Sequence, residues 1–166
     1  MKTKALMMFT PVIALAFSLA VTAQKPSFSG TWLMDRNRSF GLPPDMQQTM
    51  LITQTDDKIE LETRLITAKG ENSLRDSYFL DGQEREFTPQ GASGSTHGKG
   101  KRKAYWLSNG RGIVVEEETT AETQRGPETS QLTRKWTISN DGELTIDIYI
   151  DGPNRSYETK RIFKRK

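Results

Sequence analysis

The sequence contains no cysteine and only one histidine among its 166 residues. The lack of cysteine excludes a disulfide framework and a lipid-modified cysteine behind an export signal. With a single histidine as well, a zinc site built from His or Cys ligands is excluded. We therefore expect a domain stabilised by its hydrophobic core, and we assign no metal ion and no cofactor.

Long hydrophobic runs are also scarce. The apolar stretch 5–20 is shorter than the roughly 20 residues that a membrane-spanning helix needs. It follows Lys2 and Lys4 and precedes the small residues Val21-Thr22-Ala23, an order typical of a secretory signal peptide. We expect a cleaved signal peptide over 1–23, a single domain over 24–166 without an integral membrane span, and a periplasmic or secreted location.

The mature chain lacks an excess of charge of either sign. Removing residues 1–23 takes away two of the 24 basic residues and none of the 21 acidic ones, so a formal charge of +1 remains on 143 residues. A nucleic-acid or anionic-membrane surface requires clustered Lys and Arg. Only Lys160 to Lys166 offers such a cluster, and we interpret it as protection of an exposed strand edge. We expect a monomer that does not bind nucleic acid.

Helical periodicity is absent from Ser27 onward, where β-branched and aromatic residues alternate with polar ones between Gly, Asn and Asp. Four dipeptides can supply the positive φ angles of tight hairpins; they are Asp81-Gly82, Asn109-Gly110, Asp141-Gly142 and Asp151-Gly152. The strands predicted between the turns are 28–36, 46–55, 58–67, 73–80, 84–88, 101–108, 111–120, 130–139, 142–150 and 156–165.

Consecutive hairpins place each strand beside its predecessor, and closure of so long a meander removes its exposed edges. The sequence therefore predicts an all-β, antiparallel up-and-down β-barrel of about ten strands, with a two-sheet sandwich as the alternative. Three segments are predicted to be loops: Ser39 to Asp45, which could cover one mouth of the barrel, Gly91 to Gly100, and Thr119 to Thr129.

Alternation also identifies the inward faces. In the strand 142–150, Ile146 and Ile148 share a face with Leu144 and Ile150. Polar residues interrupt other apolar faces: Thr63 lies between Leu61 and Leu65, Arg134 lies between Leu132 and Trp136, and Glu117 follows Val115. Buried charges are tolerable in a barrel that holds water, so these positions indicate either a cavity or a location at the rim.

Few residues suggest catalysis. His97 lies in a glycine-rich segment that would not hold a general base in place. In the run from Glu116 to Glu118 the first and third residues share a face, so the three carboxylates do not converge. We expect them to pair with Lys101, Arg102 and Lys103 across the Asn109-Gly110 turn.

The segment Phe28-Ser29-Gly30-Thr31-Trp32 resembles the Gly-x-Trp signature of the lipocalins, and more closely the Phe-x-Gly-Thr-Trp opening of the fatty-acid-binding proteins. Both belong to the calycin group of ligand-binding barrels. The resemblance implies that this chain is an exported, bacterial, lipocalin-like protein. The resemblance implies that Trp32 plugs one end of the barrel against an arginine of the closing strands, while Gly30 permits close packing. Thr159-Lys160-Arg161-Ile162-Phe163 resembles the last strand of fatty-acid-binding proteins, in which the arginine holds a carboxylate. Phe163 replaces the tyrosine of that pattern, and the gap between the first two strands is too short for the two-helix portal of that family.

The leading hypothesis is an exported barrel that binds a small hydrophobic or amphipathic, fatty-acid-like ligand without catalysis. The ligand-binding residues expected are Arg161, Arg134, Tyr157, Phe163, Trp136, Ile146 and Ile148, and the barrel-closing residues expected are Phe28, Gly30 and Trp32. Two alternatives stay open: a filled barrel that acts as a structural or protein-interaction module of the cell envelope, and a calycin-type isomerase or hydratase that uses an inward acid such as Glu117.

Overall fold

The computed structural model describes residues 25–89, 98–124 and 126–166, so the predicted signal peptide and His97 lie outside the described residues. Ten strands form: β1 (Gly30–Met34), β2 (Gln47–Gln54), β3 (Lys58–Thr67), β4 (Gly70–Phe79), β5 (Arg85–Phe87), β6 (Lys99–Trp106), β7 (Gly112–Thr123), β8 (Gly126–Ile138), β9 (Leu144–Asp151) and β10 (Ser156–Arg165). The one helical segment among these residues is the 3-10 turn η1 (Arg36–Arg38), and none of them forms a helix that could cross a membrane.

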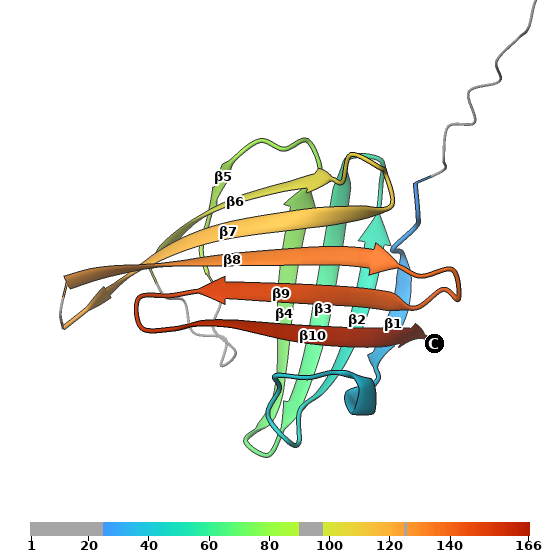
Figure 1. Ribbon diagram of the computed structural model, residues 1–166, viewed down its shortest axis with the longest axis horizontal. Helices are drawn as coiled ribbons and strands as arrows, with labels where there is room; N and C mark the ends of the chain where they lie inside the picture. The colour runs from blue at the N-terminus through green and yellow to red at the C-terminus, as the bar shows by residue number, and fades with distance from the viewer. Residues whose placement is uncertain (1–24, 90–97, 125) are drawn as a thin grey trace, which may run out of the picture.

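The ten strands make one antiparallel sheet, in the order β4-β3-β2-β1-β10-β9-β8-β7-β6-β5. The predicted all-β class and the predicted number of strands are therefore confirmed. The sheet curls on itself, so that β1–β4 cross behind β6–β10 as a second layer (Figure 1). The first and last strands close one side, where Trp32 pairs with Arg165 and Met34 pairs with Phe163.

Closure of the barrel is incomplete, which corrects the prediction of a closed meander. β4 and β5 form the two ends of the hydrogen-bonded order and do not pair with each other. Asp81-Gly82 makes a turn, with a Gly82 φ of 73°, but not the hairpin expected there. The Gly82 N–H donates to the Ala104 carbonyl at 2.9 Å, and Asp81 forms a bridge with Tyr105. The chain thus crosses from β4 to β6 instead of folding back on β4.

Two of the other expected turns have the predicted geometry. Gly110 and Gly142 have φ angles of 67° and 77° and connect β6 to β7 and β8 to β9, whereas Gly152 has no positive φ. The loop predicted over Thr119 to Thr129 is wrong, because β7 and β8 continue as a paired hairpin arm as far as the pair Thr123 and Gly126. Threonine-rich sequence is compatible with an extended ladder, so the Gly126-Pro127 signal marks only its tip.

The inner face follows the predicted alternation. Leu144, Ile146 and Ile148 are buried on β9, and Ile59, Leu61 and Leu65 are buried on β3. At one end of the barrel the aromatic rings fill the interior: Phe28 lies 6.1 Å from both Trp106 and Trp136, and Tyr78 lies 5.9 Å from Trp136, between ring centroids. Packed aromatic side chains therefore occupy this end of the barrel.

Trp32 closes the same side of the sheet. Its side chain is fully buried, and its indole N–H donates to the Phe28 carbonyl at 2.8 Å. The Arg165 guanidinium from β10 lies 4.7 Å from the Trp32 ring centroid, which is the stacking that the sequence resemblance implied. Gly30 has a φ of 134°, and a Cβ built there would lie 3.6 Å from Arg165 Nε, so the arginine passes close over the glycine.

Candidate functional site

A hollow of about 870 Å³ lies at the other end of the barrel, beyond the aromatic cluster. On β8, Trp136 packs in the aromatic cluster whereas Leu132 and Arg134 face the hollow. We call this hollow the cavity. It is lined by Gly41, Leu42, Pro43, Met46, Leu65, Thr67, Lys69, Asn72, Leu132, Arg134, Ile148, Ile150, Tyr157, Thr159 and Arg161. The interior of the barrel is thus filled at one end and hollow at the other.

The segment 39–44, which we call the strap, supplies one side of the cavity. Phe40 pairs with Lys160 of β10 through two backbone hydrogen bonds of 3.0 and 3.3 Å. The Arg36 guanidinium donates to the carbonyls of Ser39, Pro43 and Pro44 at 3.4, 3.2 and 3.4 Å. Because Gly41, Leu42 and Pro43 line the cavity, the expectation that this connection covers one mouth agrees with its position.

Gly41 allows the strap to lie flat against β10. It has a φ of 70°, and a Cβ at this position would lie 2.9 Å from Thr159 Cβ and 3.2 Å from the Glu158 carbonyl oxygen. Only glycine combines this positive φ with so close an approach. The strap is therefore fixed at both ends by hydrogen bonds and in the middle by contact with β10.

Arg161 carries the buried unpaired charge of the cavity, whereas Lys69, the other cation in the lining without an ion pair among the described residues, is exposed. Its Nη1 donates to Gln48 Oε1 at 2.7 Å, while its Nε has no hydrogen-bond partner among the described residues. No described carboxylate lies within ion-pair distance of Arg161. Burial, together with the nearby charge of Arg134, lowers the pKa of Arg161 to about 10. Next to it, the buried Thr159 hydroxyl also lacks a partner in the described part of the chain.

Arg134 lines the same cavity, but its charge is balanced by the Glu117 carboxylate, which does not line the cavity. Its Nη1 lies 2.9 Å from Glu117 Oε1, close enough for an ion pair, although not aligned as a hydrogen bond. Burial opposes the charged form of Arg134, but the Tyr78 oxygen and the Glu117 carboxylate more than offset it, so the Arg134 pKa lies above its ordinary value. In contrast to Arg161, Arg134 has a carboxylate within ion-pair distance.

Glu117 also holds Arg102, which spans the gap between β6 and β4. Arg102 Nε donates to Glu117 Oε1 at 2.6 Å, and its Nη1 donates to Asp76 Oδ1 on β4 at 2.9 Å. The guanidinium lies between the rings of Phe87 and Tyr78, at 4.0 and 4.8 Å from their centroids. Side chains therefore connect β6 to β4 on the side of the barrel where β4 and β5 do not pair.

Two of the three ion pairs predicted for the acidic run form, whereas the Lys101 ammonium pairs with Glu84 at 3.1 Å and not with Glu118. Glu116 and Glu117 pair across the ladder with Lys103 and Arg102, respectively, at 2.7 and 2.6 Å, and Glu118 lies opposite Lys101 in register. Among the described residues, no group of three His, Cys, Asp or Glu side chains is arranged to hold a metal ion.

The structure brings together four of the seven residues proposed for ligand binding: Arg134, Ile148, Tyr157 and Arg161 all line the cavity. The other three, Trp136, Ile146 and Phe163, are buried in the packed core and do not line it. Alternation placed all seven on inward faces, but it could not tell which part of each face is filled.

Two buried polar residues, Gln48 and Thr159, were not among the ligand-binding residues predicted from the sequence. Gln48 is only 4% exposed and accepts the Arg161 hydrogen bond, and Thr159 is equally buried beside it. Gln48 interrupts the apolar stripe of Met46, Met50 and Ile52 on β2, which is the same signal that singled out Thr63 and Arg134. The sequence pattern could have identified it.

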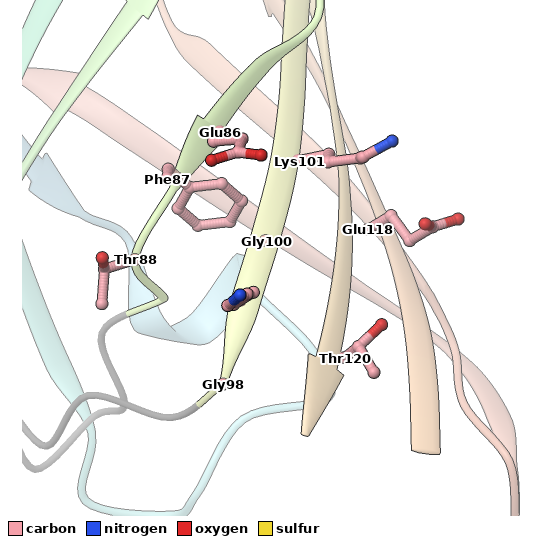
Figure 2. A pocket seen from close by; sticks show the side chains of 9 residues that line it. Glu86, Phe87, Thr88, Gly98, Gly100, Lys101, Glu118 and Thr120 are labelled. Carbon is pink, nitrogen blue, oxygen red and sulfur yellow. The ribbon is translucent and has the colours of Figure 1, made fainter. Parts of the chain in front are cut away.

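A second hollow, of about 430 Å³, lies beside β5, β6 and β7 (Figure 2). Phe87 lies over Gly100, where a Cβ would collide with the Phe87 ring, so the glycine makes room for this packing. Lys101, Glu118 and Thr120 point away from Phe87, and the side chains do not converge on one point (Figure 2). This arrangement does not favour a binding site.

No protein-family model and no curated protein matches the sequence. Among solved structures, zebrafish ileal bile acid-binding protein in complex with cholic acid is similar with a TM-score of 0.49 and 14% identity, over 84% of this chain and 98% of that one. The fatty-acid-binding protein isolated from Manduca sexta is similar with a TM-score of 0.45 and 17% identity, over 83% of this chain and 99% of that one. The structural neighbours are thus of the kind that the two ends of the sequence resemble. At these identities and TM-scores, the likeness assigns neither a family nor a ligand to the chain.

Proposed function

We propose that the protein is an exported binding protein that holds a small hydrophobic or amphipathic, fatty-acid-like ligand in the cavity without catalysis. The observation that carries this proposal is the combination of an apolar wall with one buried guanidinium, Arg161, that has no described carboxylate partner. An unpaired buried cation is costly, so an anionic headgroup at Arg161 would supply the missing partner.

The size and lining of the cavity suit such a ligand. A volume of about 870 Å³ lies within the range of roughly 300–1,000 Å³ that is usual for small-molecule sites. Seven apolar side chains contribute to the wall: Leu42, Pro43, Met46, Leu65, Leu132, Ile148 and Ile150. Burial of an alkyl chain contributes about 0.8 kcal/mol per CH₂. A ten-carbon chain would therefore contribute about 8 kcal/mol before the cost of association is subtracted, and the contact of the headgroup with Arg161 would add to this gain.

The lining does not favour an enzyme. Among the described residues that line the cavity there is no carboxylate and no histidine, the side chains that most often serve as general bases. Glu117, the inward acid that an isomerase or hydratase would require, is held by two guanidiniums behind the wall. Glu117 does not line the cavity, so a bound ligand would not contact it, and we propose binding alone.

A displacement assay tests the proposal. Delipidated protein should bind a fluorescent fatty-acid probe, and decanoate should displace it. Arg161→Met should weaken decanoate binding by about tenfold or more, because a charge-assisted contact contributes about 1.5–3 kcal/mol. Lys160→Met is the matched control, since Lys160 carries the same charge on the outer face and pairs with Asp147 at 3.1 Å. Absence of probe binding, or equal behaviour of the two variants, would refute the proposal.

Export is tested separately. N-terminal sequencing of the protein from its host should give Gln24 as the first residue, and native mass spectrometry of the same sample should show a copurifying small molecule. An intact N-terminus would refute export without affecting the binding proposal.

A further inference from the structure

The charges inside the barrel are unequally distributed. Three guanidiniums, those of Arg102, Arg134 and Arg161, are matched by two carboxylates, those of Asp76 and Glu117. Both carboxylates lie on the Arg102 side, and Arg161 has neither of them as a partner. One net positive charge therefore remains among these five described side chains, and it is at Arg161; Lys69, the further cation of the cavity lining, is exposed.

Glu117 is the residue that produces this distribution. Its side chain is only 6% exposed, and its Oε1 is 2.6 Å from Arg102 and 2.9 Å from Arg134. It is absent from the cavity lining and reaches the cavity only through Arg134, whose side chain retains 23% exposure. Glu117 therefore acts on a ligand through its partner and is a positioning residue.

We propose that Glu117 determines the headgroup charge that the cavity accepts: it neutralises Arg134, leaves Arg161 as the cation available to the ligand, and so favours a singly charged over a doubly charged headgroup. The inference rests on the proposed function and goes beyond it. Without Glu117, Arg134 and Arg161 would face the ligand together, and two free guanidiniums are suited to a dianion such as a phosphate monoester.

The test compares two ligands with the same chain, decanesulfonate with one negative charge and decyl phosphate with two at pH 8. The measured quantity is the ratio of their Kd values by isothermal titration. Glu117→Gln should shift this ratio toward decyl phosphate by about tenfold, since one added charge-assisted contact contributes about 1.5–3 kcal/mol. Glu118→Gln is the matched control: it removes the same charge from the next residue, which faces outward opposite Lys101.

A compensating variant separates charge from folding. In the double variant Glu117→Gln, Arg134→Gln, the interior again carries one net positive charge, so the ratio should return to within about threefold of the native value. A ratio for Glu117→Gln that stays within about threefold of the native value, or a double variant that retains the full shift, would overturn the inference.

The native protein alone provides a second test, of the preference for a singly charged headgroup, which does not depend on the folding of the variants. Between pH 5 and 8 an alkyl phosphate passes from one negative charge to two, because its second pKa is about 6. The Kd of decyl phosphate, divided by the Kd of decanesulfonate at the same pH, should not fall between pH 5 and pH 8. The titratable groups that face Glu117 are Arg102 and Arg134, with Asp76 and Tyr78 beside them. Binding that tightens tenfold would overturn the inference.

The two proposals fail in different ways. If the native protein binds neither decanesulfonate nor decanoate, the proposed function fails and this inference fails with it. If both ligands bind but the ratio is insensitive to Glu117, only the role of Glu117 is refuted.

Discussion

Replacing Arg161 by methionine should stabilise the ligand-free protein while weakening its affinity for anionic ligands. Methionine fills a similar length with apolar atoms and leaves no charge to be buried. A guanidinium whose pKa falls from 12.5 to about 10 on folding destabilises the folded state by about 3 kcal/mol, at 1.36 kcal/mol per pKa unit. Because the folded-state pKa is the lower one, this cost is present at neutral pH and is relieved only as the pH rises through about 10 to 12.5.

Two effects reduce the gain. Water in the cavity screens part of the cost, and the Arg161 hydrogen bond to Gln48 Oε1, worth about 1 kcal/mol, is lost. The expected net stabilisation is about 1–2 kcal/mol. With a urea m-value of about 2 kcal/mol/M, the middle of the usual range, the midpoint of unfolding should rise by roughly 0.5–1 M.

The assay is urea unfolding of delipidated protein, followed by circular dichroism with and without decanoate. Arg134→Met is the matched comparison and should have the opposite sign, because it leaves Glu117 buried with one partner fewer and should destabilise by about 3 kcal/mol. Added decanoate should stabilise the native protein through mass action and should stabilise Arg161→Met less at the same concentration. A lower midpoint for Arg161→Met in the absence of ligand would refute the assignment of Arg161 as an uncompensated cation.

Three further predictions concern the frame of the barrel and its surface. Trp32→Ala should destabilise by about 4 kcal/mol through loss of a fully buried ring, whereas Arg165→Met, which removes the cation over that ring and its hydrogen bond to the Ser27 carbonyl, should cost about 1–2 kcal/mol in urea unfolding. Gly112→Ala should lower the thermal midpoint, with a cost of about 2–4 kcal/mol, because the new Cβ would collide with a backbone carbonyl of β8. In an NMR titration the carboxyl of Glu116 should titrate below its ordinary value of 4.5, since the Lys103 ammonium lowers its pKa; its stabilising contribution is present at neutral pH and is lost as the pH falls.

Controls for these variants come from the same strands and turns. Leu33→Ala removes a side chain that is 52% exposed on the strand of Trp32, so it should cost well under 1 kcal/mol. Gly126→Ala places a Cβ where no atom lies within 4 Å, so any cost there reports backbone conformation alone. A Gly112→Ala protein as stable as the native one would contradict the close approach of β7 and β8.

Much of the fold could be predicted because its signals are local. Alternation with period two fixes which side chains of a strand share a face, so Ile146, Ile148, Arg134 and Arg161 could be assigned inward from the sequence alone. The ladders β6 to β7 and β8 to β9 follow from the Asn109-Gly110 and Asp141-Gly142 turns, where the glycines adopt the required positive φ. These signals require no knowledge of distant parts of the chain.

The failures involve pairings between distant segments. The sequence could not show that β4 and β5 remain unpaired, because Asp81-Gly82 is a turn in either case and its partner is a carbonyl 22 residues further on, at Ala104. The segment predicted to be a loop near Gly126 is instead part of the β7–β8 ladder. A ladder depends on the register of two strands and not on the composition of either one, so composition alone could not show it. Trp136 and Phe163 face inward as predicted, but at the end where aromatic rings meet and leave no space.

The sequence by itself determined an antiparallel ten-stranded sheet, the inward position of its few polar residues and the Trp32 end of the barrel, because each of these follows from the alternation and turn chemistry of short segments. Only the tertiary structure decided where the interior is hollow and which buried charges are compensated. Arg134 and Arg161 look equivalent in the sequence, since each interrupts the inner face of a strand. In the folded chain Glu117 lies within ion-pair distance of Arg134 but not of Arg161. Ion pairing depends on three-dimensional distances that strand periodicity does not encode.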